Sequence, residues 1–131
     1  MNDQSLKIPI ILQKVSAGFP SPATDFVEDE IDLNIELIKN PVSTFIIRVQ
    51  GNSMNDFKIN DGDFLIVDRS IPLTKSCISV ITVNNELVVK NVIKEFDQFY
   101  IFSKDKKKII VGKDTEAILW GVVTYIIHQV Q

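Results

Sequence analysis

The chain has 131 residues, of which 45% are hydrophobic, and this size and composition suit one globular domain with a proper core. Its formal net charge of -3 excludes the strongly basic surface of many nucleic-acid-binding domains. No apolar run reaches the ~18 residues that a membrane-spanning helix needs, so no membrane partner is expected. Cys77 is the single cysteine, which excludes an internal disulfide and suits a reducing cytoplasm.

Residues 1–24 are expected to form an N-terminal arm, because Pro20 and Pro22 forbid a regular helix and favour extended backbone. The acidic stretch Asp25–Glu30 then predicts a short helical turn, since acidic side chains complement the positive end of a helix dipole. A second short helix is predicted for Asp32–Lys39, and Pro41 ends it.

From Thr44 onward the pattern changes to short β-branched and aromatic runs separated by turn residues. Asn84 and Asn85 predict a two-residue hairpin turn, and Gly121 predicts a bulge or bend in the last strand. The predicted strands are Thr44–Val49, Phe64–Val67, Ile78–Val83, Glu86–Val92, Phe99–Ser103, Ile109–Val111 and Ile118–Val130. Residues 25–131 are therefore expected to form a mainly β domain, a compact sandwich or barrel-like body with one or two short helices.

Two residues in this β region suggest nucleophilic catalysis. Ser53 lies in a glycine-containing turn after an apolar run, and Lys90 lies in a run typical of a buried strand. A serine attacks a carbonyl only when a base removes its proton, and a lysine is such a base only as a neutral amine. Burial favours the neutral form, and Val88 and Val92 fall on the same strand face as Lys90. Each residue alone also fits a simpler interpretation, as a turn residue and as a surface lysine.

The motifs around these two residues occur in a recognisable order. The nucleophile, acidic-turn and lysine-strand motifs are Gly51–Met54, Asp61–Asp68 and Glu86–Lys90, and the segment Ala17–Ala23 precedes them. Together they resemble the LexA/UmuD-type family of self-cleaving serine–lysine peptidases. The resemblance extends from Gly18 nearly to the C-terminus, and Ser76–Cys77 replaces the Gly-Asp that is usual in the family.

The resemblance implies a complete set of site residues. Ser53 would be the nucleophile, Lys90 its general base, and Ala17–Gly18 the self-cleaved bond. The backbone N–H groups of Asn52 and Ser53 are candidates for the oxyanion hole, in which each donor is worth roughly 3 kcal/mol. No metal and no cofactor are expected.

The resemblance also implies partners and a cellular role. Family members of the UmuD type form homodimers, and RecA filaments on single-stranded DNA stimulate them to cleave themselves. The trimmed dimer then joins a UmuC-type subunit in an error-prone translesion polymerase during SOS mutagenesis. The apolar run Val122–Ile127 also favours a dimer, and the residues before Gly18 are too few for a helix-turn-helix domain, so sequence-specific DNA binding is not expected.

Two other functions remain open on the sequence, an inactive interaction module of the same fold and a peptidase that acts on other proteins. Four other features have structural interpretations. His128 is taken as structural and Cys77 as a packed thiol, while Lys104–Lys108 and Glu28–Glu30 are interpreted as solvated surface.

Overall fold

The computed structural model describes residues 6–11 and 27–131, and the chain divides into two compact units, residues 1–39 and 40–131. The predicted end of the arm, after residue 24, lies outside the described residues and stays a prediction. No helix in the described part of the chain is long and apolar enough to cross a bilayer.

The first unit contains a two-stranded antiparallel sheet followed by a short helix. Strand β1 (Lys7–Ile11) pairs with β2 (Val27–Asp32), so that Ile8 lies opposite Ile31. Helix α1 (Leu33–Leu37) begins after Asp32, whose carboxylate accepts a hydrogen bond of 2.9 Å from the Asn34 N–H. The predicted helix within Asp32–Lys39 is confirmed.

The predicted helical turn Asp25–Glu30 is wrong where the structure describes it, because residues 27–30 belong to strand β2. The acidic side chains suggest the first turn of a helix, but the backbone N–H and C=O groups of this segment pair with those of β1 instead. Asp32 provides the helix cap two residues beyond the predicted turn. A partner strand 20 residues away in sequence overrides a local charge pattern.

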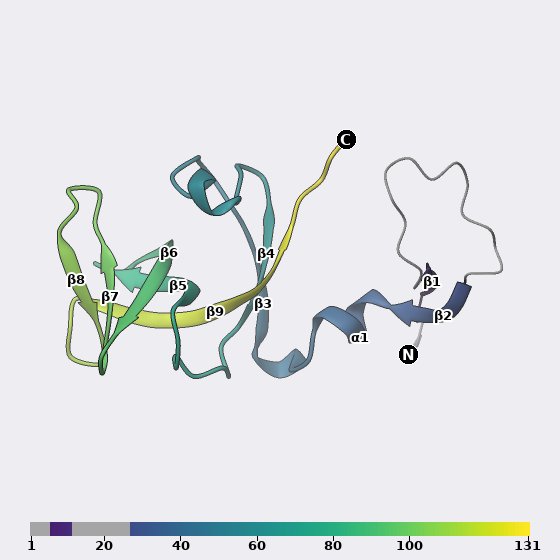
Figure 1. The fold of residues 1–131 in the computed structure, drawn as a ribbon, viewed down its shortest axis with the longest axis horizontal. Coiled ribbons are helices and arrows are strands. Elements are labelled where there is room, and N and C mark those ends of the chain that lie inside the picture. Colours follow the sequence, from purple (N-terminus) through teal and green to yellow (C-terminus); the bar gives the residue numbers. More distant parts are fainter. Residues whose placement is uncertain (1–5, 12–26) are drawn as a thin grey trace. The chain divides into compact units, whose positions relative to one another are not determined.

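The second unit is built on a seven-stranded sheet in the order β3-β4-β9-β5-β6-β7-β8. Strand β8 also pairs with β9 through Val111 and Ala117, so β9, β5, β6, β7 and β8 form a closed ring, while β3 and β4 extend from β9 (Figure 1). The mainly β prediction is confirmed. The strands are β3 (Thr44–Arg48), β4 (Phe64–Asp68), β5 (Cys77–Val83), β6 (Glu86–Glu95), β7 (Gln98–Phe102), β8 (Lys108–Val111) and β9 (Ala117–Ile127), with 3-10 helices η2 (Pro41–Ser43) and η3 (Asn55–Phe57).

The predicted turn and bend are both present. Asn84 and Asn85 have φ values of 51° and 65° and join β5 to β6 as a two-residue hairpin turn. On β9 the pairing with β5 shifts register beside Gly121, which is opposite Val80. A Cβ on Gly121 would come within 2.6 Å of Val67 Cγ1, so glycine lets β9 pass this close to β4.

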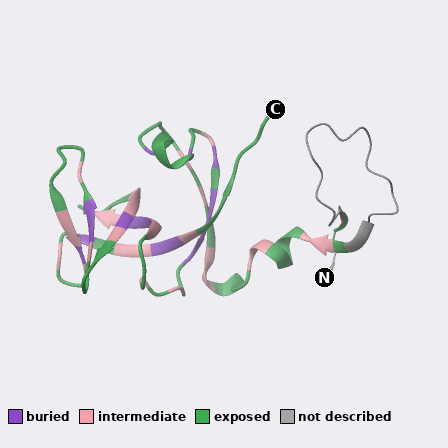
Figure 2. Ribbon diagram, in the orientation of Figure 1, coloured by how far each residue is buried: buried purple, intermediate pink, exposed green. Residues whose placement is uncertain are grey.

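The buried side chains form two clusters that share the long strands β5 and β9. One cluster consists of Met54, Ile59, Leu65, Val67 and Val80. The other lies within the ring and consists of Ile81, Val92, Ile101, Val111 and Ala117. Figure 2 shows most buried positions on strands and mostly exposed connections, although Met54 and Ile59 are buried in the connection from β3 to β4. The loop after β3, which carries Ser53, is anchored in the first cluster, whereas strand β6, which carries Lys90, contributes Val92 to the second and packs Val89 against the first.

Candidate active site

Ser53 lies in the loop that joins β3 to β4. The base of this loop is closed by two hydrogen bonds of 2.8 Å, from the Val49 N–H to the Asp63 carbonyl and from the Gly62 N–H to the Val49 carbonyl. Gly51 has φ of 95°, a conformation that glycine adopts without a steric penalty, and its N–H donates to the Asp61 carboxylate at 2.7 Å. The chain therefore turns sharply just before the serine.

Two buried apolar residues fix the backbone on the other side of Ser53. Met54 and Ile59 belong to one core cluster, and the Met54 carbonyl accepts hydrogen bonds from the N–H groups of Phe57 and Ile59. Ser53 itself is exposed. Its side chain therefore faces outward from a backbone that the core holds in place.

Lys90 lies near the middle of β6, between Val88 and Val92. Val92 is fully buried in the core of the ring and Val88 packs against the same cluster, as expected for alternate residues on one strand face. Lys90 is half-buried, so the predicted sealing of its side chain from water is only partial. Its amine Nζ donates a hydrogen bond of 3.2 Å to the Phe102 carbonyl at the end of β7.

Ser53 and Lys90 line two cavities together. The larger has a volume of about 420 Å³ and is lined by Ile47, Arg48, Val49, Gln50, Ser53, Met54, Leu87, Val88, Val89, Lys90 and Lys104. The smaller, of about 200 Å³, is lined by Ser53, Met54, Phe57, Lys90, Asn91, Ile93 and Phe102. The fold therefore brings a serine and a lysine that are 37 residues apart in sequence to one surface cleft.

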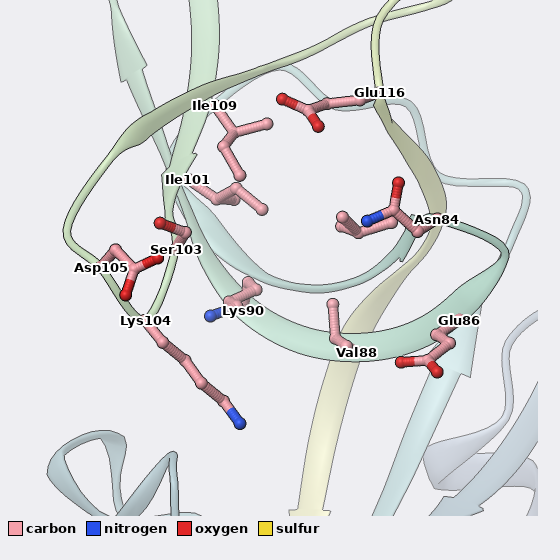
Figure 3. A pocket seen from close by; sticks show the side chains of 11 residues that line it. Asn84, Glu86, Val88, Lys90, Ile101, Ser103, Lys104, Asp105, Ile109 and Glu116 are labelled. Carbon is pink, nitrogen blue, oxygen red and sulfur yellow. The ribbon is translucent and has the colours of Figure 1, made fainter.

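A third cavity, of about 450 Å³, opens on the ring side of Lys90. Figure 3 shows Lys90 and Val88 directed into it from β6, with Ile101 and Ile109 on the facing wall. Lys104 is directed away from this cavity in the same view, and it also lines the larger cavity that contains Ser53. Lys104–Lys108 are exposed, as their interpretation as solvated surface predicts. That interpretation does not predict that Lys104 lines the cavity that contains Ser53.

Of the other predicted site groups, the oxyanion-hole residues lie in the described part of the chain and the cleavage site does not. The N–H groups of Asn52 and Ser53 donate to no acceptor among the described residues, whereas the Asn52 carbonyl accepts from the Asn55 N–H. Ala17 and Gly18, the predicted cleavage site, lie outside the described residues. Ser76 and Cys77 are accommodated at the start of β5, where Ser76 Oγ accepts a 2.8 Å hydrogen bond from the Lys94 N–H.

The sequence matches the model of the family described as peptidase S24-like over residues 9–124, which is most of the chain. The chain belongs to the peptidase S24-like family. Among its relatives, protein MucA of Salmonella typhimurium is 38% identical over 120 residues, covering 90% of this chain and 82% of MucA. Protein ImpA of Shigella flexneri is 34% identical over 127 residues, covering 97% and 88%.

A LexA repressor, from Clostridium perfringens, is also similar to this S24-like chain. It is 35% identical over 108 residues, which cover 81% of this chain and 53% of the repressor. The predicted membership of the LexA/UmuD-type peptidases is thereby confirmed, and the chain is a peptidase-family protein of that kind.

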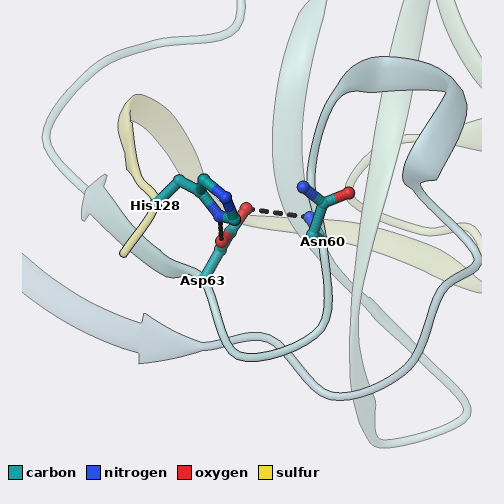
Figure 4. Close-up of polar contacts among 3 residues, drawn as sticks. All are labelled: Asn60, Asp63 and His128. Carbon is teal, nitrogen blue, oxygen red and sulfur yellow. Dashed lines mark hydrogen bonds and ion pairs between the residues drawn. The ribbon is translucent and has the colours of Figure 1, made fainter. Parts of the chain in front are cut away.

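One polar pair close to the site of this S24-like chain was not predicted. His128 Nδ1 lies 2.7 Å from Asp63 Oδ1, and the Asn60 N–H donates to Asp63 Oδ2 at 2.8 Å (Figure 4). The hydrogen bond from Asn60 and then the one with His128 hold the pKa of the Asp63 carboxyl below its ordinary value, although burial opposes them. The structural interpretation of His128 rests on the absence of an Asp or Cys at metal or triad spacing near it in sequence, and its partner Asp63 is 65 residues away.

Proposed function

We propose that this chain is a self-cleaving peptidase in which Ser53 is the nucleophile and Lys90 the general base. The observation that carries the proposal is that both residues line the same two cavities in a member of a peptidase family. The bond cleaved is Ala17–Gly18, within a segment that resembles the cleavage segment of the family.

In the proposed reaction, Ser53 Oγ attacks the Ala17 carbonyl carbon while its proton passes to the neutral amine of Lys90. The oxyanion that forms accepts hydrogen bonds from the N–H groups of Asn52 and Ser53, which have no acceptor among the described residues. The bond from Ala17 to the Gly18 nitrogen then breaks, and Lys90 returns the proton to that nitrogen. Water hydrolyses the remaining acyl-serine ester.

The hydrogen bond from Lys90 to the Phe102 carbonyl supports this assignment. A neutral amine has two N–H bonds and one lone pair, so it can donate to a carbonyl and accept a proton at the same time. The Phe102 carbonyl accepts at 3.2 Å and thereby restricts the directions available to the lone pair.

The cellular role follows from the family resemblance. We infer that the chain forms a homodimer, that RecA filaments on single-stranded DNA stimulate its cleavage, and that the trimmed dimer joins a UmuC-type translesion polymerase in SOS mutagenesis. The exposed apolar side chains of Tyr125, Ile126 and Ile127 on β9 are compatible with a dimer surface. The cytoplasm is the compartment in which these partners would be met.

Mass spectrometry of the purified chain tests the proposal. After incubation with RecA filaments, and separately at alkaline pH without RecA, the stable fragment should begin at Gly18 with the sequence Gly-Phe-Pro-Ser. The Ser53→Ala chain should remain intact under both conditions. An intact wild-type chain would instead support an inactive interaction module. Cleavage of added, unrelated proteins would support a peptidase of broader specificity.

A further inference from the structure

The smaller cavity beside Ser53 and Lys90 differs in chemistry from the larger one. Its apolar walls come from Met54, Phe57, Ile93 and Phe102, and Lys90 is the one charged residue that lines it. The larger cavity instead contains two further cationic side chains, Arg48 and Lys104. An extended peptide bound at Ser53 and Lys90 would therefore have both an aromatic surface and a basic surface within reach.

The two aromatic side chains of the smaller cavity are both exposed. The exposed fractions are 41% for Phe57 and 46% for Phe102, and the two come from different elements, η3 and β7. The ring of Phe102 packs edge-on against Tyr100 with centroids 5.4 Å apart, and Phe57 follows the anchored Met54 turn. The Phe102 ring is thus packed on one side and the backbone of Phe57 is fixed, while both rings leave apolar surface uncovered for a side chain to contact.

The spacing of an extended peptide identifies what can reach this cavity. Side chains two residues apart point to the same side of an extended chain and lie about 6.6 Å apart along it. In an extended peptide with the Ala17 carbonyl at Ser53, the side chain of Phe19 would therefore be expected on the same side as that of Ala17. Pro20 follows Phe19 and biases it toward extended backbone.

We propose that the cavity formed by Met54, Phe57, Ile93 and Phe102 is a specificity site for the aromatic side chain two residues after the cleaved bond, which is Phe19 in this chain. The proposal rests on the proposed function and names the class of peptide that the site selects. The segment that binds belongs either to the same chain or to another copy. Aromatic rings pair favourably at centroid distances of about 4.5–7 Å, so Phe57 and Phe102 suit a phenylalanine better than a polar side chain.

A double-mutant cycle on the full chain tests this assignment, with the rate of self-cleavage at alkaline pH as the readout. Phe57→Ala and Phe19→Ala should each slow cleavage about tenfold, which corresponds to roughly 1.4 kcal/mol. The double variant should be no slower than either single variant, because the two rings act as one contact. Phe19→Leu and Phe57→Leu should each retain more activity than the corresponding alanine variant.

Phe96 provides the matched control, since it is 89% exposed in the turn between β6 and β7 and lines none of the three cavities. Phe96→Ala should leave the cleavage rate within about twofold of wild type. If wild type and Phe96→Ala both stay intact, the proposed function is wrong. If wild type cleaves at Ala17–Gly18 while the Phe19 and Phe57 variants keep its rate, or slow it additively, the specificity site is wrong.

The side of the cleaved bond is tested by one further variant. Val15 lies two residues before Ala17 and is also expected to face the cleft. Val15→Ala and Phe57→Ala should slow cleavage additively. If the double variant instead cleaves no more slowly than either single variant, the cavity binds the residue before the cleaved bond, and the assignment to Phe19 is overturned.

Discussion

Asp63 and Asp68 are buried, and both oxygens of each carboxylate are hydrogen-bonded, whereas the hydroxyl of the exposed Ser53 bonds to no other described residue. Asp68 accepts four hydrogen bonds, from the Asn40 amide, the Ser43 and Ser70 hydroxyls and the Ser70 N–H. A buried polar group without a hydrogen-bond partner costs stability, so the two aspartates need their hydrogen bonds. A nucleophilic hydroxyl, in contrast, must be free to contact the substrate.

Within the second unit, the residues that stabilise the fold are therefore different from the residues proposed to carry out the reaction. A substitution at these two carboxylates removes every hydrogen bond that the buried group accepts and should weaken the fold. A substitution in the cleft removes a group that the fold does not need and should remove only the reaction. The predictions below test this separation, beginning with the largest expected effect.

Ser53→Ala and Lys90→Ala should each slow self-cleavage by at least about 1,000-fold, because nucleophile and base act as a unit, and the double variant should be no slower. Lys90→Arg should fail as well, since a guanidinium does not give up its proton in this pH range. The free energy of unfolding should change by less than about 0.5 kcal/mol in Ser53→Ala, because its hydroxyl has no partner among the described residues. Gel-based cleavage assays and urea unfolding measure the two effects.

Lys94 is the matched control for Lys90, since it lies four residues further along β6 and is exposed over the Phe99 ring. Lys94→Ala should cleave at the wild-type rate. The rate in wild type should also rise from neutral to alkaline pH, because the base acts as a neutral amine. Near-normal cleavage by Lys90→Ala would remove the basis for the serine–lysine assignment.

The opposite behaviour is expected of Asp68. Asp68→Ala should lower the free energy of unfolding by about 2–3 kcal/mol, because four hydrogen bonds to a buried carboxylate, from Asn40, Ser43 and Ser70, are lost. The cleavage rate of the folded fraction should be unchanged. Asp97→Ala, at an exposed turn between β6 and β7, serves as control and should have little effect on urea unfolding. A stable Asp68→Ala chain with slow cleavage would contradict the proposed separation.

Local patterns predicted most of the second unit. β-branched runs predicted its strands, and the asparagine pair predicted the turn between β5 and β6, because each signal acts over a few residues. Ser53 and Lys90 were proposed as a site from chemistry and family resemblance, and the fold places them on shared cavities. Whether they react is tested by the cleavage assays.

Non-local pairings were not predictable in the same way. The segment Val27–Glu30 is a strand because β1 lies beside it, and nothing in its own acidic sequence indicates that partner. Phe57 and Phe102 meet at one cavity from elements 45 residues apart, and exposed aromatic residues carry no periodic signal. The pairing of His128 with Asp63 likewise depends on where β9 ends relative to the loop after β3.

The smallest expected effect concerns this last pair and appears at acid pH. The pKa values of Asp63 and Asp68 are both held below the ordinary 3.8, the second mainly by the hydrogen bonds from Asn40 and Ser70. A carboxyl whose pKa is lower in the folded state adds stability above the unfolded value. That stability is lost as the pH falls through the folded value. The wild-type chain should therefore lose stability progressively below about pH 4.

Removing His128 should weaken one of these two contributions and leave the other intact. In His128→Ala the pKa of Asp63 should rise toward 3.8, because one of the hydrogen bonds that lower it is gone. The melting temperature near pH 5 should fall by a few degrees, less than in Asp68→Ala, and the difference from wild type should narrow as the pH falls and Asp63 becomes protonated in both chains. Gln129→Ala, at the neighbouring exposed position, should follow the wild-type curve throughout. Parallel wild-type and His128→Ala curves from pH 5 to pH 2 would mean that His128 supports the fold through packing and not through the charge of Asp63.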